Sequence, residues 1–117
     1  MMDTLSDRDL QWRPVCQVDD LVAQSGVVAR VGGEQVALFY LPHLDTPTVF
    51  AVGNRDPRSG ANVIGRGLVG QVGGHLVVSS PLYKQQFRLH DGVCLQDDRQ
   101  RLPTWRVRIH GDAVEIA

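Results

Sequence analysis

The chain has 117 residues, enough for one domain with its own hydrophobic core. Hydrophobic residues make up 43%, which excludes a largely disordered chain. Twelve basic residues face thirteen acidic ones, so the basic excess typical of nucleic-acid binding proteins is missing. No apolar run approaches the roughly 20 residues that span a bilayer, and the polar first ten residues do not resemble a secretion signal. We expect a cytoplasmic protein that binds neither nucleic acid nor membrane, with residues 1–10 as a tail and 11–117 as one domain.

Short β-branched runs separated by turn residues follow one another from Trp12 onward. Residues 18–24 have room for a short helix. Four pairs of runs flank the turns at residues 32–33, 73–74, 90–92 and 111–112, which is typical of β-hairpins. Many short strands at even spacing predict an all-β sandwich or barrel. The expected strands are residues 12–18, 27–31, 35–40, 49–53, 68–72, 75–79, 87–89, 93–95, 105–110 and 113–116.

A glycine-rich segment, residues 65–70, matches the G-x-G-x-x-G fingerprint of dinucleotide-binding folds. Asp91 even lies about 20 residues further on, where that fingerprint expects an acidic residue. The fingerprint holds a pyrophosphate only when a helix N-terminus follows, because the amide groups of that helix bind it. A valine-rich run with Gly73-Gly74 follows instead and indicates a hairpin. We therefore interpret the segment as a loop of glycines with positive φ, not as a nucleotide site.

No catalytic or metal-binding pattern is visible among the remaining residues. There is no G-x-S-x-G motif, and the carboxylate pairs at residues 19–20 and 97–98 are adjacent, so on a strand they would face opposite sides. The histidines show none of the close spacing that metal sites usually have. Cys16 and Cys94 are expected to be reduced, buried thiols. The four histidines are His43, His75, His90 and His110.

The C-terminal part of the chain is rich in basic residues. Arg106 and Arg108 alternate with Val107 and Ile109, so we expect both arginines on one face of a strand. We interpret that face as a solvated outer surface, because exposed faces normally carry charge. The alternative is that it meets an acidic partner.

Three segments together carry a resemblance to a known family. They are W-R-P-V-C at residues 12–16, N-R-D-P-R-S-G-A-N-V at 54–63, and S-P-L-Y-K-Q-Q-F-R-L at 80–89. From Trp12 to Ile116 the chain is similar to the small subunit of assimilatory NAD(P)H-dependent nitrite reductase, a family that resembles Rieske domains. The resemblance implies a small antiparallel β-sandwich of Rieske type with two loops at one end.

Those two loops are where a Rieske domain holds its 2Fe–2S cluster, through C-x-H in one loop and C-x-x-H in the other. By the resemblance, Asn54 and Asp56 stand at the first pair of ligand positions, and Ser80 and Tyr83 at the second. Cluster iron needs thiolate or imidazole donors, and none of these four residues supplies one. The resemblance therefore implies a Rieske-like domain that binds no cofactor and no metal.

The family also implies a function and a partner. The chain would be a non-catalytic small subunit docked on a large subunit that carries FAD, an iron–sulfur cluster and sirohaem and reduces nitrite to ammonium in nitrate assimilation. We expect Arg55, Arg58, Tyr83 and Lys84 in the two loops to form the docking surface, because they offer charge-assisted hydrogen bonds and an aromatic anchor. Alternatively, Tyr83 packs inward. A Rieske-like ferredoxin-type electron carrier and a stand-alone protein-interaction module are the other readings.

Overall fold

The computed structural model describes residues 10–45 and 48–117, so residues 1–9 of the expected tail lie outside it. Within this part, two short 3-10 turns are the only helical segments, and neither is long enough to cross a membrane. They are η2 (Val18–Asp20) and η3 (Ile64–Arg66). The strands are β1 (Arg13–Gln17), β2 (Ser25–Val31), β3 (Glu34–Tyr40), β4 (Val49–Gly53), β5 (Leu68–Val72), β6 (His75–Ser79), β7 (Gln86–Arg88), β8 (Thr104–Trp105), β9 (Val107–His110) and β10 (Ala113–Ile116).

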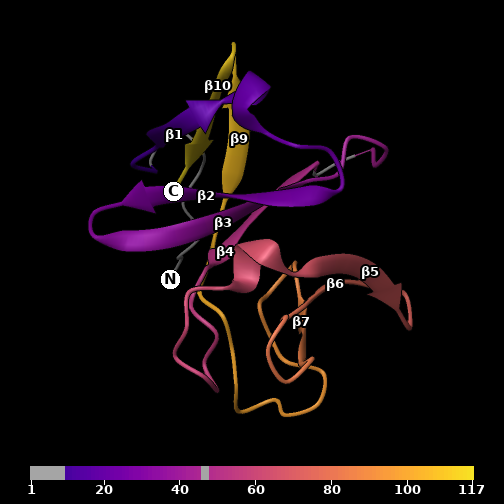
Figure 1. The fold of residues 1–117 in the computed structure, drawn as a ribbon. Helices are drawn as coiled ribbons and strands as arrows, with labels where there is room; N and C mark the ends of the chain where they lie inside the picture. The colour runs from indigo at the N-terminus through magenta and orange to yellow at the C-terminus, as the bar shows by residue number, and fades with distance from the viewer. Residues whose placement is uncertain (1–9, 46–47) are drawn as a thin grey trace, which may run out of the picture.

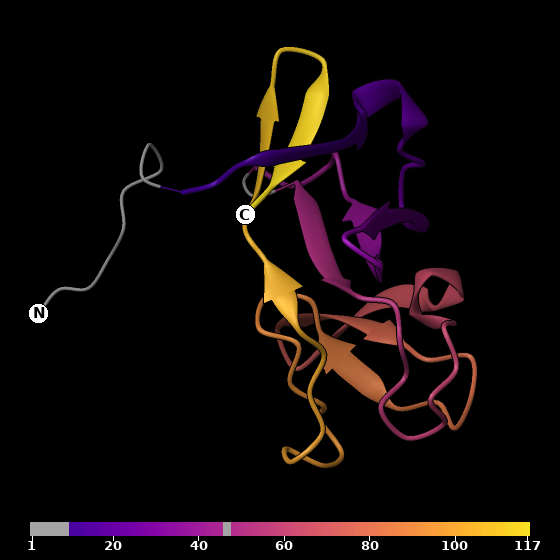
Figure 2. The same ribbon diagram turned by 90° about the vertical axis from the view of Figure 1, so that its left-hand side faces the viewer.

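Three antiparallel sheets make up the fold, in the orders β1-β10-β9, β2-β3-β4-β8 and β5-β6-β7. Figure 1 shows the first sheet at the top, the second across the middle and the third at the bottom. The view turned by 90° keeps the same order (Figure 2). The all-β antiparallel architecture expected from the sequence is confirmed.

The central sheet has a hydrophobic core on each of its faces. On β3, Ala37 and Phe39 belong to one core, and Val36 and Leu38 belong to the other, because side chains alternate along a strand. The first core is completed mainly from the lower sheet and the loops beside it, and the second from the upper sheet. The first includes Val52, Ile64, Val78, Phe87, Leu89, Cys94 and Leu102, and the second Val49, Ala51, Val114 and Ile116.

The hairpin predictions at the Gly-Gly pairs are confirmed. Gly32 and Gly33 have φ of 55° and 86°, and Gly73 and Gly74 have φ of 55° and 83°. Two successive positive φ values are the signature of a type I′ turn, whose twist matches that of the strands it joins. The turns connect β2 to β3 and β5 to β6, each in full antiparallel register.

The expected strand at residues 93–95 is wrong. Val93 and Cys94 make only isolated bridges, to Arg101 and Phe87. The reason is that successive backbone N–H groups bond to different segments: that of Cys94 donates to Gln100 and that of Leu95 to Gln86. The segment is therefore shared between β7 and a tight loop and forms no ladder of its own.

The expected single strand at residues 105–110 is also wrong, because it divides at Arg106. β8 pairs with β4 of the central sheet, whereas β9 pairs with β10 of the upper sheet. At the junction, the backbones of Arg106 and Ala117 exchange two hydrogen bonds of 2.9 and 3.0 Å. The segment at 18–24 contains only the η2 turn rather than a longer helix.

The glycine-rich segment at 65–70 forms η3 and β5, so no helix follows the motif. Our expectation of positive φ there is wrong: Gly65, Gly67 and Gly70 are absent from the residues with positive φ, and Gly67 has φ −72°. The structure requires glycine at positions 65 and 67 for another reason, whereas a Cβ on Gly70 would meet no atom within 4 Å. A Cβ on Gly65 would lie 2.7 Å from the Val28 side chain, and one on Gly67 would overlap the Ser79 carbonyl oxygen. Close packing of η3 against neighbouring strands excludes side chains here.

We expect Gly92→Ala to lower the free energy of unfolding by about 3 kcal/mol or more, because it combines two penalties. Gly92 has φ +79°, and a Cβ would overlap the Leu102 carbonyl oxygen. Gly74→Ala is the matched control, since Gly74 has φ +83° but no atom within 4 Å of a Cβ; we expect about 1 kcal/mol there. Urea denaturation measures both. Equal losses would contradict a steric role for Leu102.

Candidate functional site

The site predicted from the sequence is formed by two loops, one between β4 and η3 and one between β6 and β7. Four residues stand at the former ligand positions as the resemblance assigns them, and three of these are buried: Asn54, Asp56 and Ser80 are 3%, 0% and 0% exposed. Tyr83 differs, with 61% of its surface exposed. The four residues therefore have two different environments, and only Tyr83 reaches the solvent.

The carboxylate of Asp56 joins the two loops. Its Oδ1 accepts hydrogen bonds from the backbone N–H groups of Arg58 (2.8 Å) and Ser59 (3.2 Å) within the first loop. Its Oδ2 accepts a short hydrogen bond from the hydroxyl of Ser80 in the second loop. A buried carboxylate is costly unless its oxygens are hydrogen-bonded. The three donors meet that requirement and hold the loops side by side.

Asn54 connects the first loop to the rest of the fold. Its Oδ1 accepts a hydrogen bond from the Gly65 N–H (2.6 Å), and its Nδ2 donates to Oε1 of Gln35 (2.8 Å). The Asn54 backbone N–H also donates to the Gln35 carbonyl, at 3.0 Å. The amide thus bridges η3 and the start of β3, and both of its polar ends are satisfied.

The second loop presents Tyr83 outward from a tight turn. Tyr83 and Lys84 have φ of 62° and 58°, the left-handed region that non-glycine residues rarely adopt. Two bonds close the turn, from the N–H of Ser80 to the Gln85 carbonyl (2.8 Å) and from the N–H of Leu82 to the Ser80 hydroxyl (3.2 Å). The exposure of Tyr83 shows that the alternative in which it packs inward is wrong.

The guanidinium of Arg58 lies over the ring of Tyr83, with its carbon 4.4 Å from the ring centroid. This cation–π contact is a second connection between the loops, on their exposed side. The structure therefore brings the former ligand positions together through the Asp56–Ser80 hydrogen bond and the Arg58–Tyr83 stack.

The residues at these positions do not fit a Rieske cluster. Asn54, Asp56 and Ser80 offer oxygen and amide groups that are already bound to protein partners, and Tyr83 offers an exposed phenol. Among residues 10–45 and 48–117, no three His, Cys, Asp or Glu side chains are placed to hold a metal ion.

The two cysteines lie apart from the loops and are free thiols. Cys94 is buried in the first core, and Cys16 is half-buried on β1 beside the second. Burial, with a smaller contribution from the charge of Asp20, raises the pKa of Cys16, so its thiol stays protonated at neutral pH.

The remaining candidates do not assemble into a site. All four histidines are exposed. Arg108 is not a free charge: its Nε donates to Glu115 (2.6 Å), and its guanidinium stacks on the ring of Trp12 (4.4 Å). The carboxylates of Asp20 and Asp97 cap local turns through the N–H groups of Gln17 and Arg99.

Comparison with known proteins agrees with this geometry. Residues 11–117 match the family model described as a Rieske-like 2Fe-2S domain. The chain is 41% identical over 106 residues to the small subunit of NADH nitrite reductase from Escherichia coli K12, across 91% of this chain and 96% of that protein. The chain belongs to the family of nitrite reductase small subunits. The residues that the resemblance assigns to ligand positions, Asn54, Asp56, Ser80 and Tyr83, are not the thiolate and imidazole donors of a Rieske 2Fe–2S cluster.

Solved structures place this chain within the Rieske fold. The NMR structure of the E. coli protein NirD superposes with a TM-score of 0.80 at 40% identity, covering 91% of this chain and 94% of that one. The ferredoxin of carbazole 1,9a-dioxygenase from Nocardioides aromaticivorans has a TM-score of 0.76 at 17% identity, covering 92% and 98%. At that identity the likeness concerns the fold alone, and it confirms the Rieske-type architecture.

A fourth relative is of a different kind. The NAD(P)H nitrite reductase large subunit of Klebsiella oxytoca is 40% identical to this chain over 105 residues, which are 90% of this chain but 11% of that protein. A domain of this kind is thus part of a much longer chain in that organism.

Sequence reasoning missed the residues that support the loops. Gln35 lies 19 positions before Asn54, and no motif connects the two. A buried amide must have partners, but its identity does not say where they come from. The stacking of Arg58 on Tyr83 could not be predicted from the sequence either, although we expected both residues in the docking surface.

We expect Ser80→Ala to lower the free energy of unfolding by about 2 kcal/mol, because it leaves a buried carboxylate oxygen without its donor. Ser59→Ala is the control: Ser59 is exposed, and its hydroxyl only accepts a bond from the Ala61 N–H. We expect a loss below about 1 kcal/mol there. Thermal and urea unfolding measure both variants, and similar losses would show that Asp56 does not depend on Ser80.

We expect the protein to take up no stoichiometric iron when reconstituted anaerobically with iron and sulfide, because no thiolate or imidazole stands at the ligand positions. Iron and acid-labile sulfide assays with a visible spectrum check this, with a Rieske ferredoxin treated in parallel. Stoichiometric iron with Rieske-type absorption would refute the expectation.

Proposed function

We propose that this chain is the accessory small subunit of a cytoplasmic NAD(P)H nitrite reductase that reduces nitrite to ammonium in nitrate assimilation. A large catalytic subunit, in which we expect FAD, an iron–sulfur cluster and sirohaem, carries out the reaction. This chain contributes no catalytic residue. It docks on the large subunit through its two loops.

The observation that carries this proposal is the bonding at the former ligand positions. In a Rieske domain the cluster ties the two loops together. Here the hydrogen bond between Ser80 and Asp56 does so, and it keeps the loops together without a redox centre. An electron carrier needs such a centre, so this arrangement favours a binding role over the ferredoxin-type alternative. The Klebsiella oxytoca relative adds support, because there a domain of this kind is covalently part of a large subunit.

The proposed docking surface consists of Arg55, Arg58, Tyr83 and Lys84, all exposed. None of its three cations forms a salt bridge with an acidic group within the described residues. Tyrosine and arginine are enriched among the residues that dominate binding energy at interfaces. The stack of Arg58 on Tyr83 holds both side chains in place, which lowers the entropy lost on docking.

The backbone of this surface is also unusual. Two successive non-glycine residues, Tyr83 and Lys84, are held in the left-handed region. Such conformations persist only where the surrounding structure enforces them, and they are concentrated at binding sites. The bonds of Ser80 to Gln85 and Leu82 provide that enforcement.

We expect Tyr83→Ala to weaken binding to the large subunit by about 2 kcal/mol, near thirtyfold, while the melting temperature stays close to that of the wild type. The side chain is mostly exposed, so folding loses little when it is removed. Lys84→Glu should also weaken the complex. Ile109→Ala is the control, because Ile109 is 44% exposed on β9, in the sheet at the opposite end of Figure 1. Calorimetry or surface plasmon resonance with purified large subunit measures all three.

Two results would count against the proposal. If Tyr83→Ala and Lys84→Glu fold and bind like the wild type, docking occurs elsewhere, and the Arg106 and Arg108 segment is then the next surface to vary. If the wild-type chain fails to co-purify with any sirohaem-containing protein, the stand-alone interaction module becomes the better reading.

A further inference from the structure

A second feature lies beside the first loop: a pocket of about 570 Å³. Three arginines from separate parts of the chain line it, namely Arg30 of β2, Arg55 of the first loop and Arg101 of the segment before β8. Glu34 is the acidic residue among its walls. The other lining residues are glycines, prolines and amides: Gly33, Gln35, Gly53, Asn54, Pro57, Gly60, Asn62 and Pro103.

Backbone and amide hydrogen bonds fix the walls of this pocket. Arg30 lies directly across the β2–β3 ladder from Gln35. Gln35 in turn accepts the side-chain bond of Asn54 (2.8 Å), the residue before Arg55. On the other side, the N–H of Gly53 donates to the Pro103 carbonyl at 2.8 Å, close to Arg101 in the chain. The three arginines therefore extend from a frame that is in place before any ligand binds.

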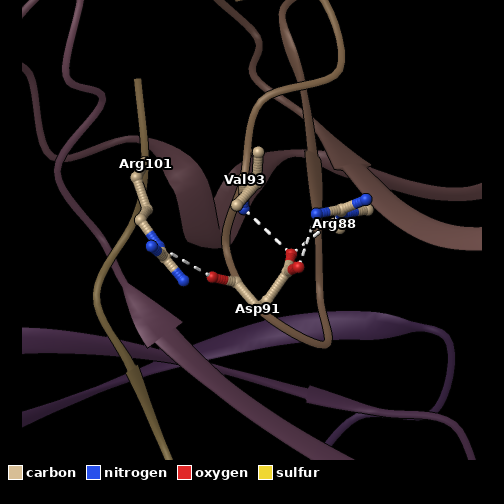
Figure 3. Close-up of polar contacts among 4 residues, drawn as sticks. All are labelled: Arg88, Asp91, Val93 and Arg101. Carbon is tan, nitrogen blue, oxygen red and sulfur yellow. Dashed lines mark hydrogen bonds and ion pairs between the residues drawn. The ribbon is translucent and has the colours of Figure 1, made fainter. Parts of the chain in front are cut away.

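Arg101 is positioned by the turn at Asp91 (Figure 3). Its Nε donates to the Asp91 carbonyl at 3.3 Å. The Asp91 carboxylate accepts bonds from Nε and Nη2 of Arg88 (2.9 and 2.5 Å) and from the Val93 N–H (3.1 Å). Partial burial opposes ionisation of Asp91, but these bonds outweigh it and hold its pKa below the ordinary value. The turn stays intact at neutral pH, and the terminal nitrogens of Arg101 are left available.

The charges around the pocket are unbalanced. Three positive side chains face one negative one. Within residues 10–45 and 48–117, no carboxylate forms a salt bridge with Arg30, Arg55 or Arg101. Like charges gathered in one pocket repel one another, and an anion that carries at least two charges would relieve that repulsion.

The size and lining of the pocket narrow the class of anion. Its volume lies in the range of about 300–1,000 Å³ that is typical of small-molecule sites. Guanidinium groups present paired N–H donors that match the oxygens of phosphate. A Cβ on Gly33 would have no atom within 4 Å, so a ligand can approach the backbone closely there. Pro57 and Pro103 offer apolar walls for a ring.

We propose that this pocket binds a small molecule that bears a diphosphate group, of the size of a nucleoside diphosphate. This inference does not rest on docking of the large subunit. Arg55 contributes to both surfaces, so Arg30 and Arg101, which lie outside the docking surface, decide the test.

The test is calorimetric titration of the full chain with inorganic pyrophosphate, ADP and adenosine at low and physiological salt. We expect pyrophosphate and ADP to bind and adenosine, which lacks phosphate, not to bind. Arg30→Ala and Arg101→Ala should each weaken binding of ADP by about tenfold or more, the effect of losing a charge-assisted hydrogen bond. Glu34→Gln should strengthen it severalfold, because it removes the acidic group of the pocket.

Arg66→Ala is the matched control, since Arg66 is an exposed arginine outside the pocket, and it should leave binding unchanged. Arg66→Ala removes the same charge as Arg30→Ala but lies outside the pocket, so a difference between these two variants distinguishes this pocket from general attraction of anions. If neither pyrophosphate nor ADP binds, or if Arg66→Ala weakens binding as much as Arg30→Ala, the proposal is wrong. If neither probe binds and Arg30→Ala also weakens the complex with the large subunit, the pocket belongs to the docking surface instead.

Discussion

Four consecutive side chains of β3, from Val36 to Phe39, are fully buried, although neighbours on a strand point to opposite faces. A strand of this kind must be covered on both sides, and this requirement gives the fold its three layers. The lower sheet covers Ala37 and Phe39, and β10 of the upper sheet covers Val36 and Leu38. Burial of Val36, Leu38 and Phe39 contributes about 1.5–3 kcal/mol each, so neither layer is dispensable.

The loops of the candidate site take their positions from this arrangement. The first begins where β4 leaves the central sheet, and the second where β6 leaves the lower sheet. They come from different sheets, so something must hold them together at their ends. In cluster-bearing relatives of this fold, iron does so. In this chain the burial of Asp56 requires a donor from the opposite loop, and Ser80 supplies it. The domain thereby keeps the Rieske fold, but a hydrogen bond joins its two loops where a Rieske domain has an iron–sulfur cluster.

Much of the fold followed from local patterns, and the failures occurred where one segment serves two neighbours. β4, β5, β6 and β10 match their expected bounds because each is a single run between turn residues. The strand at residues 105–110 was misjudged because its alternation continues unbroken while its pairing changes sheet at Arg106. Local periodicity carries no information about which strand lies alongside.

The candidate site was only partly predictable, because the sequence does not show which distant residues its members contact. The resemblance to nitrite reductase small subunits identified Asn54, Asp56, Ser80 and Tyr83 as positions, but it did not say which of them would be buried. That distinction depends on contacts between residues distant in sequence, those of Asn54 with Gln35 and Gly65 and that of Asp56 with Ser80. The arginine pocket was invisible for a stronger reason, since Arg30, Arg55 and Arg101 come from three segments that only the folded chain brings together.

The pairing of β1 with β10 has a consequence for how the protein is made. Arg13 lies opposite Ile116, so the first strand finds its partner only in the last one. During synthesis β1 leaves the ribosome early and stays unpaired while the intervening hairpins are translated. The lower sheet is local in sequence and can form during that time, whereas the upper sheet must wait for β10. Until β10 is made, both edges of β1 stay unpaired and can template aggregation of the nascent chain.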